Sequence, residues 1–246
     1  MVLQAPGSLG SAGRRTSYHK FRFAPASLIG YGAGAGRSKG IPEVELPLDI
    51  NEVKGFLAED EGKALFDAAR DAAGLGPVLE IGSYCGKSTI YLGLACQALG
   101  ATLYALDHHS GSEEHQPGEL FHDPGLFDRS SERMDSFRAF RSNIRAAGLD
   151  DTVVPLVAPS ALVARDWRTP LGMVFIDGGH SLDAALADYR GFSGHIVRGG
   201  ILAIHDLFPN PAEGGQAPYT IYQLALASGL FEPLAQVCTL GLLQRR

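Results

Sequence analysis

Two short segments of the sequence, 176-IDGGHS-181 and 204-IHDLF-208, bring acidic residues and histidines together directly after apolar runs. Carboxylates and imidazoles are the side chains that most often move protons in enzymes. Charged groups that are buried need partners, so this combination is hard to explain as ordinary core. We therefore expect both segments to contribute to one functional crevice. The residues concerned are Asp177, His180, His205 and Asp206.

One use of such a cluster needs no metal. His180 would act as a general base that removes a proton from a substrate group, and Asp177 or Asp206 would orient its imidazole ring. The alternative for His180 is structural, as a histidine at the start of a helix that is merely satisfied by its neighbours. Ser181, which follows it, is suited to cap that helix.

A regular alternation of strands and helices must position these residues. Short, nearly all-apolar runs predict strands over 77–81, 102–107, 152–158, 172–177, 200–206, 231–237 and 238–244. Apolar residues at helical spacing predict helices over 51–74, 88–100, 132–148, 160–166, 181–194 and 218–229. Such an alternation indicates a doubly wound α/β fold with a mostly parallel sheet buried on both faces. The last two strands leave no room for a helix between them, so one of them should run antiparallel.

In sheets of this kind, ligands bind beyond the carboxyl ends of the strands. This rule selects the segments that follow the predicted strands, and it places both acid–histidine segments at the same edge. It also selects a glycine loop after the first strand, 80-EIGSYCGKS-88, and Asp107 at the end of the second.

The glycine loop is close to two phosphate-binding motifs and matches neither. A P-loop needs GxxxxGK[ST], whereas here the loop is one residue short and Ile81 stands where the first glycine should be. A dinucleotide motif needs GxGxxG, whereas Tyr84 occupies the place of the middle glycine. Glu80 puts a negative charge beside the loop, which disfavours a phosphate and suits a cation. A tight turn without any ligand remains an alternative.

The segment 78-VLEIGSYCGKST-89, followed by Asp107, resembles the class I S-adenosylmethionine-dependent methyltransferases, and within them the bacterial small-molecule O-methyltransferases. The resemblance extends over roughly residues 51–246. It implies a seven-stranded, Rossmann-like sheet with a reversed last strand and S-adenosyl-L-methionine as cofactor. Asp107 would hold the ribose hydroxyls and Ser160 would contact the adenine edge. The cofactor-binding residues implied in this way are Glu80, Gly82, Ser83, Tyr84, Gly86, Ser88, Asp107, His108 and Ser160.

The resemblance also raises the question of a divalent metal. Asp177 and Asp206 resemble the pair of aspartates that holds Mg²⁺ in metal-dependent O-methyltransferases, where the metal orients a substrate hydroxyl. His205 stands where some relatives have another acid, which would move the preference toward Mn²⁺, Zn²⁺ or Fe²⁺. The implied metal ligands are Asp177, His205 and Asp206, and the implied catalytic residues are His180, Asp177 and Asp206.

The predicted activity is methyl transfer to a small-molecule acceptor, at a hydroxyl oxygen, with or without a metal. Two rivals remain on the same fold. One is an iron-dependent hydroxylase built from Asp177, His180, His205 and Asp206, and the other is a module that binds the cofactor without turnover.

The N-terminal segment differs from the rest of the chain. Residues 1–40 hold six Lys and Arg and no acid, with several glycine-rich runs, although the whole chain has a net charge of −6. We predict a basic, glycine-rich arm over 1–45 and a methyltransferase domain over 46–246. The arm is either loosely docked, or it covers an active site or a partner subunit. In the last case the protein would be a homo-oligomer.

Composition narrows the compartment and the partners. A net negative charge argues against a nucleic-acid partner, and no apolar run approaches the length of a membrane-spanning helix. Three cysteines without CxxC spacing fit a reducing compartment, so we predict a cytoplasmic protein. Two long segments, 108–131 and 207–220, are candidates for lids over the site. The second of them includes Tyr219, and Tyr222 follows it.

Overall fold

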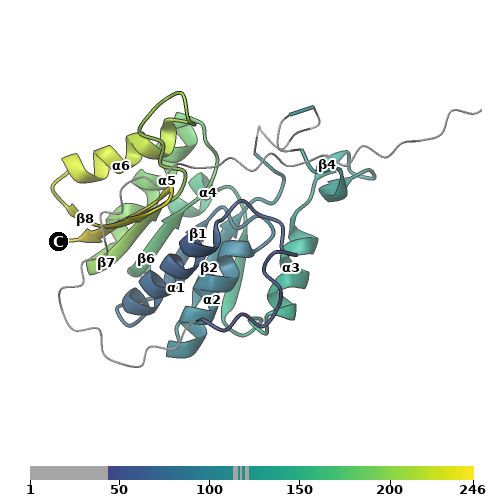
Figure 1. Ribbon diagram of the computed structural model, residues 1–246, viewed down its shortest axis with the longest axis horizontal. Coiled ribbons are helices and arrows are strands. Elements are labelled where there is room, and N and C mark those ends of the chain that lie inside the picture. The colour runs from purple at the N-terminus through teal and green to yellow at the C-terminus, as the bar shows by residue number, and fades with distance from the viewer. Residues whose placement is uncertain (1–43, 113–115, 117, 120–121) are drawn as a thin grey trace, which may run out of the picture.

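The computed structural model describes residues 44–112, 116, 118–119 and 122–246 (Figure 1). The predicted arm lies outside these residues except for its last two positions, 44 and 45. The arm, its role at a partner subunit and the domain boundary at 45/46 therefore stay predictions.

A seven-stranded sheet forms the centre of the molecule, in the order β5-β2-β1-β6-β7-β9-β8. Neighbouring strands from β5 to β7 run parallel, and β9 is antiparallel to both β7 and β8. The predicted parallel sheet with a reversed last strand is confirmed. The strands are β1 Val78–Ile81, β2 Leu103–Asp107, β5 Val153–Val157, β6 Leu171–Ile176, β7 Ile196–Ile204, β8 Phe231–Val237 and β9 Leu240–Arg245.

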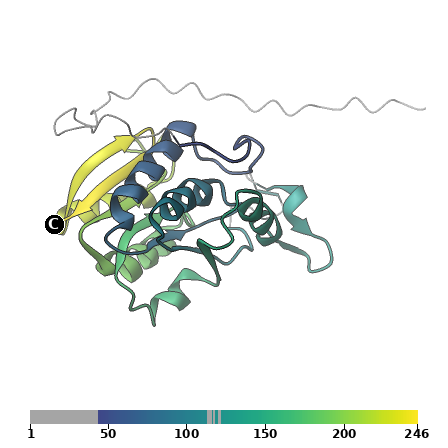
Figure 2. The same ribbon diagram turned by 90° about the horizontal axis from the view of Figure 1, so that it is seen from below.

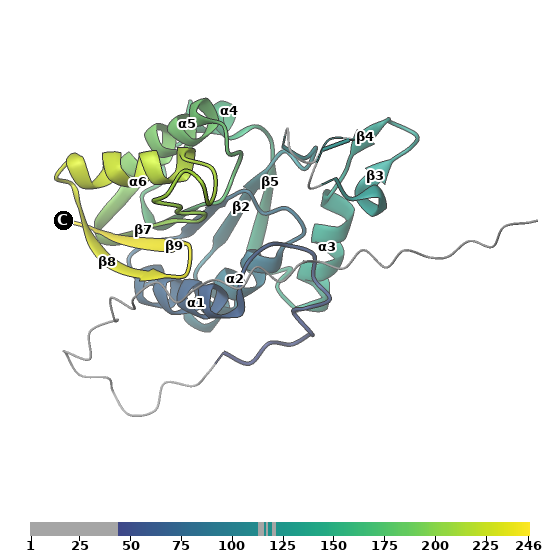
Figure 3. The same ribbon diagram turned by 45° about the horizontal axis from the view of Figure 1, so that its top comes forward.

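Helices cover both faces of this sheet, with α1, α2 and α3 on one side and α4, α5 and α6 on the other (Figure 3). Seen from below, α1 and α2 lie side by side against the sheet (Figure 2). Each layer closes over its own apolar core, which is why β1 and β6 are buried along their whole length. The helices are α1 Glu59–Ala73, α2 Lys87–Leu99, α3 Phe137–Ala146, α4 Ser160–Ala164, α5 Leu182–Phe192 and α6 Ala217–Ala227.

Two predicted helices begin later than their apolar pattern indicates. The helix predicted from residue 51 begins only at Glu59, after an irregular segment over 51–58 in which Gly55 has φ +153°. Val53 and Leu57, which produced the helical spacing, are buried without being helical. The helix predicted from residue 132 begins at Phe137, because the residues before it form a small hairpin of β3 (Phe127–Asp128) and β4 (Arg133–Met134).

The alternation of side chains along the strands decides which side of the sheet each strand end faces. Met173 and Phe175 on β6 belong to the core under α1 and α2, and so do their register partners Ile201 and Ala203 on β7. Continuing the period of two, the residues at 177 and 205 turn to this same side. Asp206, two residues after the end of β7, has φ +58°, so the extended backbone does not continue through it.

The helices and the cysteines of the described residues can be compared with the sequence analysis. Within the described ranges, no helix combines the length and the apolar character needed to cross a bilayer. All three cysteines lie in these ranges and are unpaired in disulfides: Cys85 and Cys96 are buried, and Cys238 is exposed.

Candidate active site

A pocket of about 480 Å³ opens at the carboxyl ends of the strands and joins the glycine loop to the acid–histidine cluster. The strand-end rule therefore selected the correct edge of the sheet. Two of the predicted cofactor residues, Glu80 and Gly86, do not line the pocket. Those that do are Gly82, Ser83, Tyr84, Ser88, Asp107, His108 and Ser160, together with Asp177, His180, His205 and Asp206.

Gly82 is required by the close approach of two strand-end loops. Its φ is +91°, and a Cβ added to it would lie 2.1 Å from the backbone carbonyl oxygen of Asp177. A side chain at this position would therefore push apart the loops after β1 and β6. Tyr84 also has a positive φ, of 44°. Non-glycine residues held in this region store strain and are concentrated at functional sites.

Glu80 lies beneath the glycine loop. Its carboxyl is fully buried and accepts hydrogen bonds from the hydroxyls of Ser88 and Thr89, both at 2.5 Å, in the first turn of α2. Burial raises the pKa of Glu80 to about 8, against the lowering effect of these two hydroxyls. Burial therefore favours the protonated form of this carboxyl. Glu80 joins β1 to α2 through these two bonds, and its predicted part in cofactor binding stays a prediction.

Asp107 is half-buried at the end of β2, and backbone donors fix its carboxylate. Tyr84 N donates to Oδ2 at 2.8 Å and His109 N donates to Oδ1 at 2.7 Å. Ser83 Oγ in the neighbouring loop is buried and has no hydrogen-bond partner among the described residues. Because Ser83 also lines the pocket, a polar ligand group there would satisfy its hydroxyl.

Ser160 at the start of α4 donates a hydrogen bond to the buried carboxylate of Asp188 on α5. Burial raises the pKa of Asp188 to about 6, although the Ser160 hydroxyl opposes this. Both residues line the pocket. Asp188 was missed by the sequence analysis, because nothing in the amphipathic segment 182–192, which also holds Asp183, marks one acid as buried and the other as solvated.

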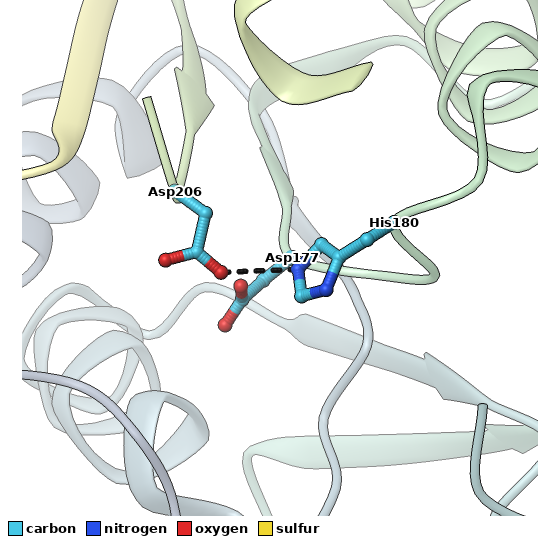
Figure 4. Close-up of side chains that lie close together, drawn as sticks. All are labelled: Asp177, His180 and Asp206. Carbon is cyan, nitrogen blue, oxygen red and sulfur yellow. Dashed lines mark ion pairs between the residues drawn. The ribbon is translucent and has the colours of Figure 1, made fainter. Parts of the chain in front are cut away.

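Asp177, His180 and Asp206 form the acid–histidine cluster (Figure 4), with one ligand atom of each lying within 4.8 Å of the others. His180 Nε2 lies 3.0 Å from Asp206 Oδ2. Burial works to raise the pKa of Asp206, but the hydrogen bond from His180 and the charge of His205 outweigh it and lower that pKa. Burial raises the pKa of Asp177, more than the neighbouring His205 lowers it.

The metal ligands predicted from the sequence, Asp177, His205 and Asp206, stay a prediction, and the surroundings of His205 bear on it. Its ring is buried, with Nδ1 3.0 Å from Asp177 Oδ1 and Nε2 3.0 Å from Glu61 Oε2. Burial alone would lower the pKa of His205, but the two adjacent carboxylates raise it to about 11. A ring that is protonated on both nitrogens offers no lone pair to a metal. In this protonation state His180 is the better candidate for the third ligand beside Asp177 and Asp206.

The irregular segment before α1 forms part of the pocket wall, which the sequence analysis did not foresee. Lys54 Nζ lies 2.5 Å from Asp123 Oδ2, so this segment is tied to the long loop after β2. The rings of Phe56 and Tyr84 stack at 6.3 Å. The expected second lid does not contribute its tyrosines: Tyr219 and Tyr222 are absent from the described lining, and Tyr222 packs against the core under α6.

Residues 79–207 of the chain, more than half of its length, match a protein family described as a methyltransferase domain. The chain belongs to this methyltransferase family. The matched range begins within β1 and ends just after Asp206, so it contains the glycine loop, Asp107 and the whole acid–histidine cluster. The methyltransferase class predicted from the loop motif is confirmed.

Solved methyltransferase structures share the fold of this chain. The O-methyltransferase NovP is 17% identical, with a TM-score of 0.58 over 75% of this chain and 78% of its own. TomG, an O-methyltransferase from Streptomyces achromogenes solved in complex with SAM, is 17% identical, with a TM-score of 0.54 over 77% and 81%. An O-methyltransferase from Bacillus cereus in complex with SAH is 18% identical, with a TM-score of 0.52 over 79% and 86%. At these identities the likeness establishes the fold.

Proposed function

We propose that this methyltransferase uses S-adenosyl-L-methionine to methylate a hydroxyl oxygen of a small-molecule acceptor. The observation that carries the proposal is that one pocket joins the glycine loop and Asp107 to His180 and Asp206. Asp107, which could bind a nucleoside, and His180, which could take up a proton, therefore line the same pocket. The acceptor type agrees with the O-methyltransferases among the fold relatives.

The residues around the glycine loop fit such a cofactor. The carboxylate of Asp107, already oriented by two backbone N–H groups, would accept hydrogen bonds from the ribose diol. The buried hydroxyl of Ser83 would gain a partner in a polar group of the ligand. Ser160, held by Asp188, would lie at the adenine edge. When bound, S-adenosylmethionine supplies a methyl group that is electrophilic because it is attached to a sulfonium.

His180 would act as the general base. Asp206 Oδ2 accepts from Nε2 at 3.0 Å, which fixes the tautomer and leaves the lone pair of the neutral ring on Nδ1. The ring would take the acceptor's proton at Nδ1 as the oxygen becomes nucleophilic, and Asp206 would stabilise the imidazolium that results.

Metal assistance is the second candidate for the same step. Two carboxylates and one imidazole suit Mn²⁺ or Fe²⁺ better than the all-oxygen set that Mg²⁺ prefers. Asp177, His180 and Asp206 would be the ligands, and the metal would lower the pKa of an acceptor hydroxyl. In that case His180 would be a ligand, so the two candidates exclude one another as roles for this ring.

Calorimetry with S-adenosylhomocysteine tests the cofactor assignment. The wild-type chain should bind it, and Asp107→Ala should weaken binding by about 100-fold or more, because two charge-assisted hydrogen bonds are lost. Affinity within about threefold of the wild type would contradict the ribose assignment. Ser110→Ala, which changes an exposed hydroxyl on the same loop, is the matched control.

Transfer of a labelled methyl group to a panel of hydroxylated small molecules, with and without chelator, tests the reaction. His180→Ala should lower kcat by about 100-fold or more and leave cofactor affinity nearly unchanged. Activity that survives the chelator favours the metal-free base. Binding without transfer to any acceptor would favour the non-catalytic module, and oxygen-dependent product formation with iron would favour the hydroxylase.

A further inference from the structure

A chain of hydrogen bonds runs from the start of α1 to the acid–histidine cluster. Glu61 on α1, His205 after β7 and Asp177 after β6 are joined by two contacts of 3.0 Å, one at each nitrogen of the His205 ring. Glu61 and His205 are 2% and 4% exposed, so the contact between them is shielded from water, whereas the contact with Asp177 is only partly buried. Glu61 lies outside the range that matches the methyltransferase family.

Glu61 has all its acceptor positions in use. Oε1 accepts from the backbone N–H and the hydroxyl of Thr239, both at 2.8 Å. Oε2 accepts from Ala58 N at 3.0 Å and faces His205 Nε2. A carboxylate has about four lone-pair sites, so Glu61 must be ionised and His205 Nε2 must carry the proton between them. Three elements, α1, the β8–β9 turn and β7, therefore meet at this carboxylate.

On its other side, His205 faces both carboxylates of the cluster. Nδ1 lies 3.0 Å from Asp177 Oδ1 and 3.6 Å from Asp206 Oδ1. One oxygen of Asp177 and one of Asp206 lie within 4.8 Å of one another. Two ionised carboxylates at this distance repel unless a donor lies between them. His205 is that donor, and Glu61 holds the ring in the orientation in which Nδ1 points at them.

We propose that Glu61 and His205 are positioning residues of the transfer reaction: through the ring they hold Asp177 and Asp206, and so His180, in place at the pocket. The inference rests on the function proposed above for the same site. Neither residue needs to touch cofactor or acceptor for this role. The role also differs from a purely structural one, since it acts through Nδ1 on the carboxylates of Asp177 and Asp206.

Two substitutions separate the halves of the ring. His205→Asn keeps an N–H near the place of Nδ1, facing Asp177, and loses the contact with Glu61. His205→Gln keeps an N–H near the place of Nε2, facing Glu61, and loses the contact with Asp177. Thr239→Val is a control, because it removes one donor from Glu61 and leaves both His205 contacts.

All variants are compared for S-adenosylhomocysteine affinity by calorimetry and for kcat with an acceptor methylated by the wild type. We expect each affinity to stay within about threefold of the wild type, and H205Q to have a kcat at least about tenfold below that of H205N. T239V should keep the wild-type kcat. Equal kcat values for H205N and H205Q, or losses that follow the loss of affinity, would mean that His205 is only structural.

A second readout needs no acceptor. Long-range ¹H–¹⁵N spectra of the chain report which ring nitrogen of His180 carries the proton. The wild type and H205N should show the proton on Nε2, toward Asp206, and H205Q should show a mixture of tautomers. The same tautomer in H205N and H205Q would overturn the inference. Failure of the wild type to bind S-adenosylhomocysteine would instead overturn the proposed function, and the spectra would still test the positioning role.

Discussion

Replacing Glu80 by glutamine should change how the stability of the protein depends on pH. The pKa of this buried carboxyl is raised to about 8 in the folded chain, from an ordinary value of 4.5. Below pH 4.5 the carboxyl is protonated in both states, and its contribution to stability is fully present. As the pH rises, the unfolded chain ionises first, so this contribution is lost progressively until the folded carboxyl ionises near pH 8.

The size of the effect follows from the same two values. One pKa unit corresponds to about 1.4 kcal/mol, so the whole loss amounts to about 5 kcal/mol. Between pH 5 and pH 8 the free energy of unfolding should fall by about 2–4 kcal/mol on account of Glu80 alone. Glu80→Gln is neutral throughout and can still bond the hydroxyls of Ser88 and Thr89. The variant should therefore lack this part of the pH dependence.

Equilibrium urea unfolding of both proteins from pH 5 to pH 9 measures the effect. The free energy of unfolding of E80Q minus that of the wild type should rise with pH by the amount given above. Glu52→Gln, at an exposed position of the irregular segment before α1, is the control for the loss of one carboxylate. A difference for E80Q that is flat within about 0.5 kcal/mol would refute the reasoning, since Glu80 would then be ionised in the folded chain.

Two further predictions concern backbone and burial. Gly82→Ala should lower the free energy of unfolding by about 2–4 kcal/mol, because its Cβ meets the carbonyl of Asp177 in a left-handed conformation, whereas Gly100→Ala, left-handed but in open space, should cost about 1 kcal/mol. Urea unfolding decides, and equal costs would contradict the close contact. Between pH 3.8 and about 6 the wild type should lose about 2–3 kcal/mol of stability, because Asp188 ionises in the unfolded chain before it does so in the folded chain. Asp188→Asn keeps an acceptor for Ser160 and should lack this loss. An unchanged pH dependence would mean that Asp188 is not shifted.

The fold was largely predictable because its main signals are local and repeated. All-apolar runs of strand length, each followed by a helical pattern, leave few arrangements other than a parallel sheet covered on both sides. The start of α1 was not predictable in this way. Val53 and Leu57 are buried as expected, but they belong to an irregular segment. This segment packs so closely over the side chain of Lys87 that a Cβ at Gly55 would have no room. Helical spacing indicates which residues are buried, and it does not exclude another backbone path to the same core.

The location of the site could be predicted from the sequence, but not all of the residues that form it. The strand-end rule brought Asp107, Asp177 and Asp206 to one pocket. Neither Asp188 nor Glu61 carried a signal, since each is one acid within a helix. Glu61 stands in an acidic first turn, 59-EDE-61, which is the usual composition of a solvated helix start. Its burial is a property of the tertiary structure.

His205 and Asp206 show why adjacent residues at a strand end can have opposite roles. The period of two along β7 turns position 205 toward α1, as it turns Ile201 and Ala203. There a histidine meets Glu61, which is 144 residues away in the chain. Asp206 has left the regular strand at φ +58°, and its carboxylate reaches His180 at 3.0 Å. The sequence shows which side of the sheet position 205 faces, but it does not show that His205 meets Glu61 there. That acid makes the ring a donor on both sides, which supports the positioning role proposed above for His205.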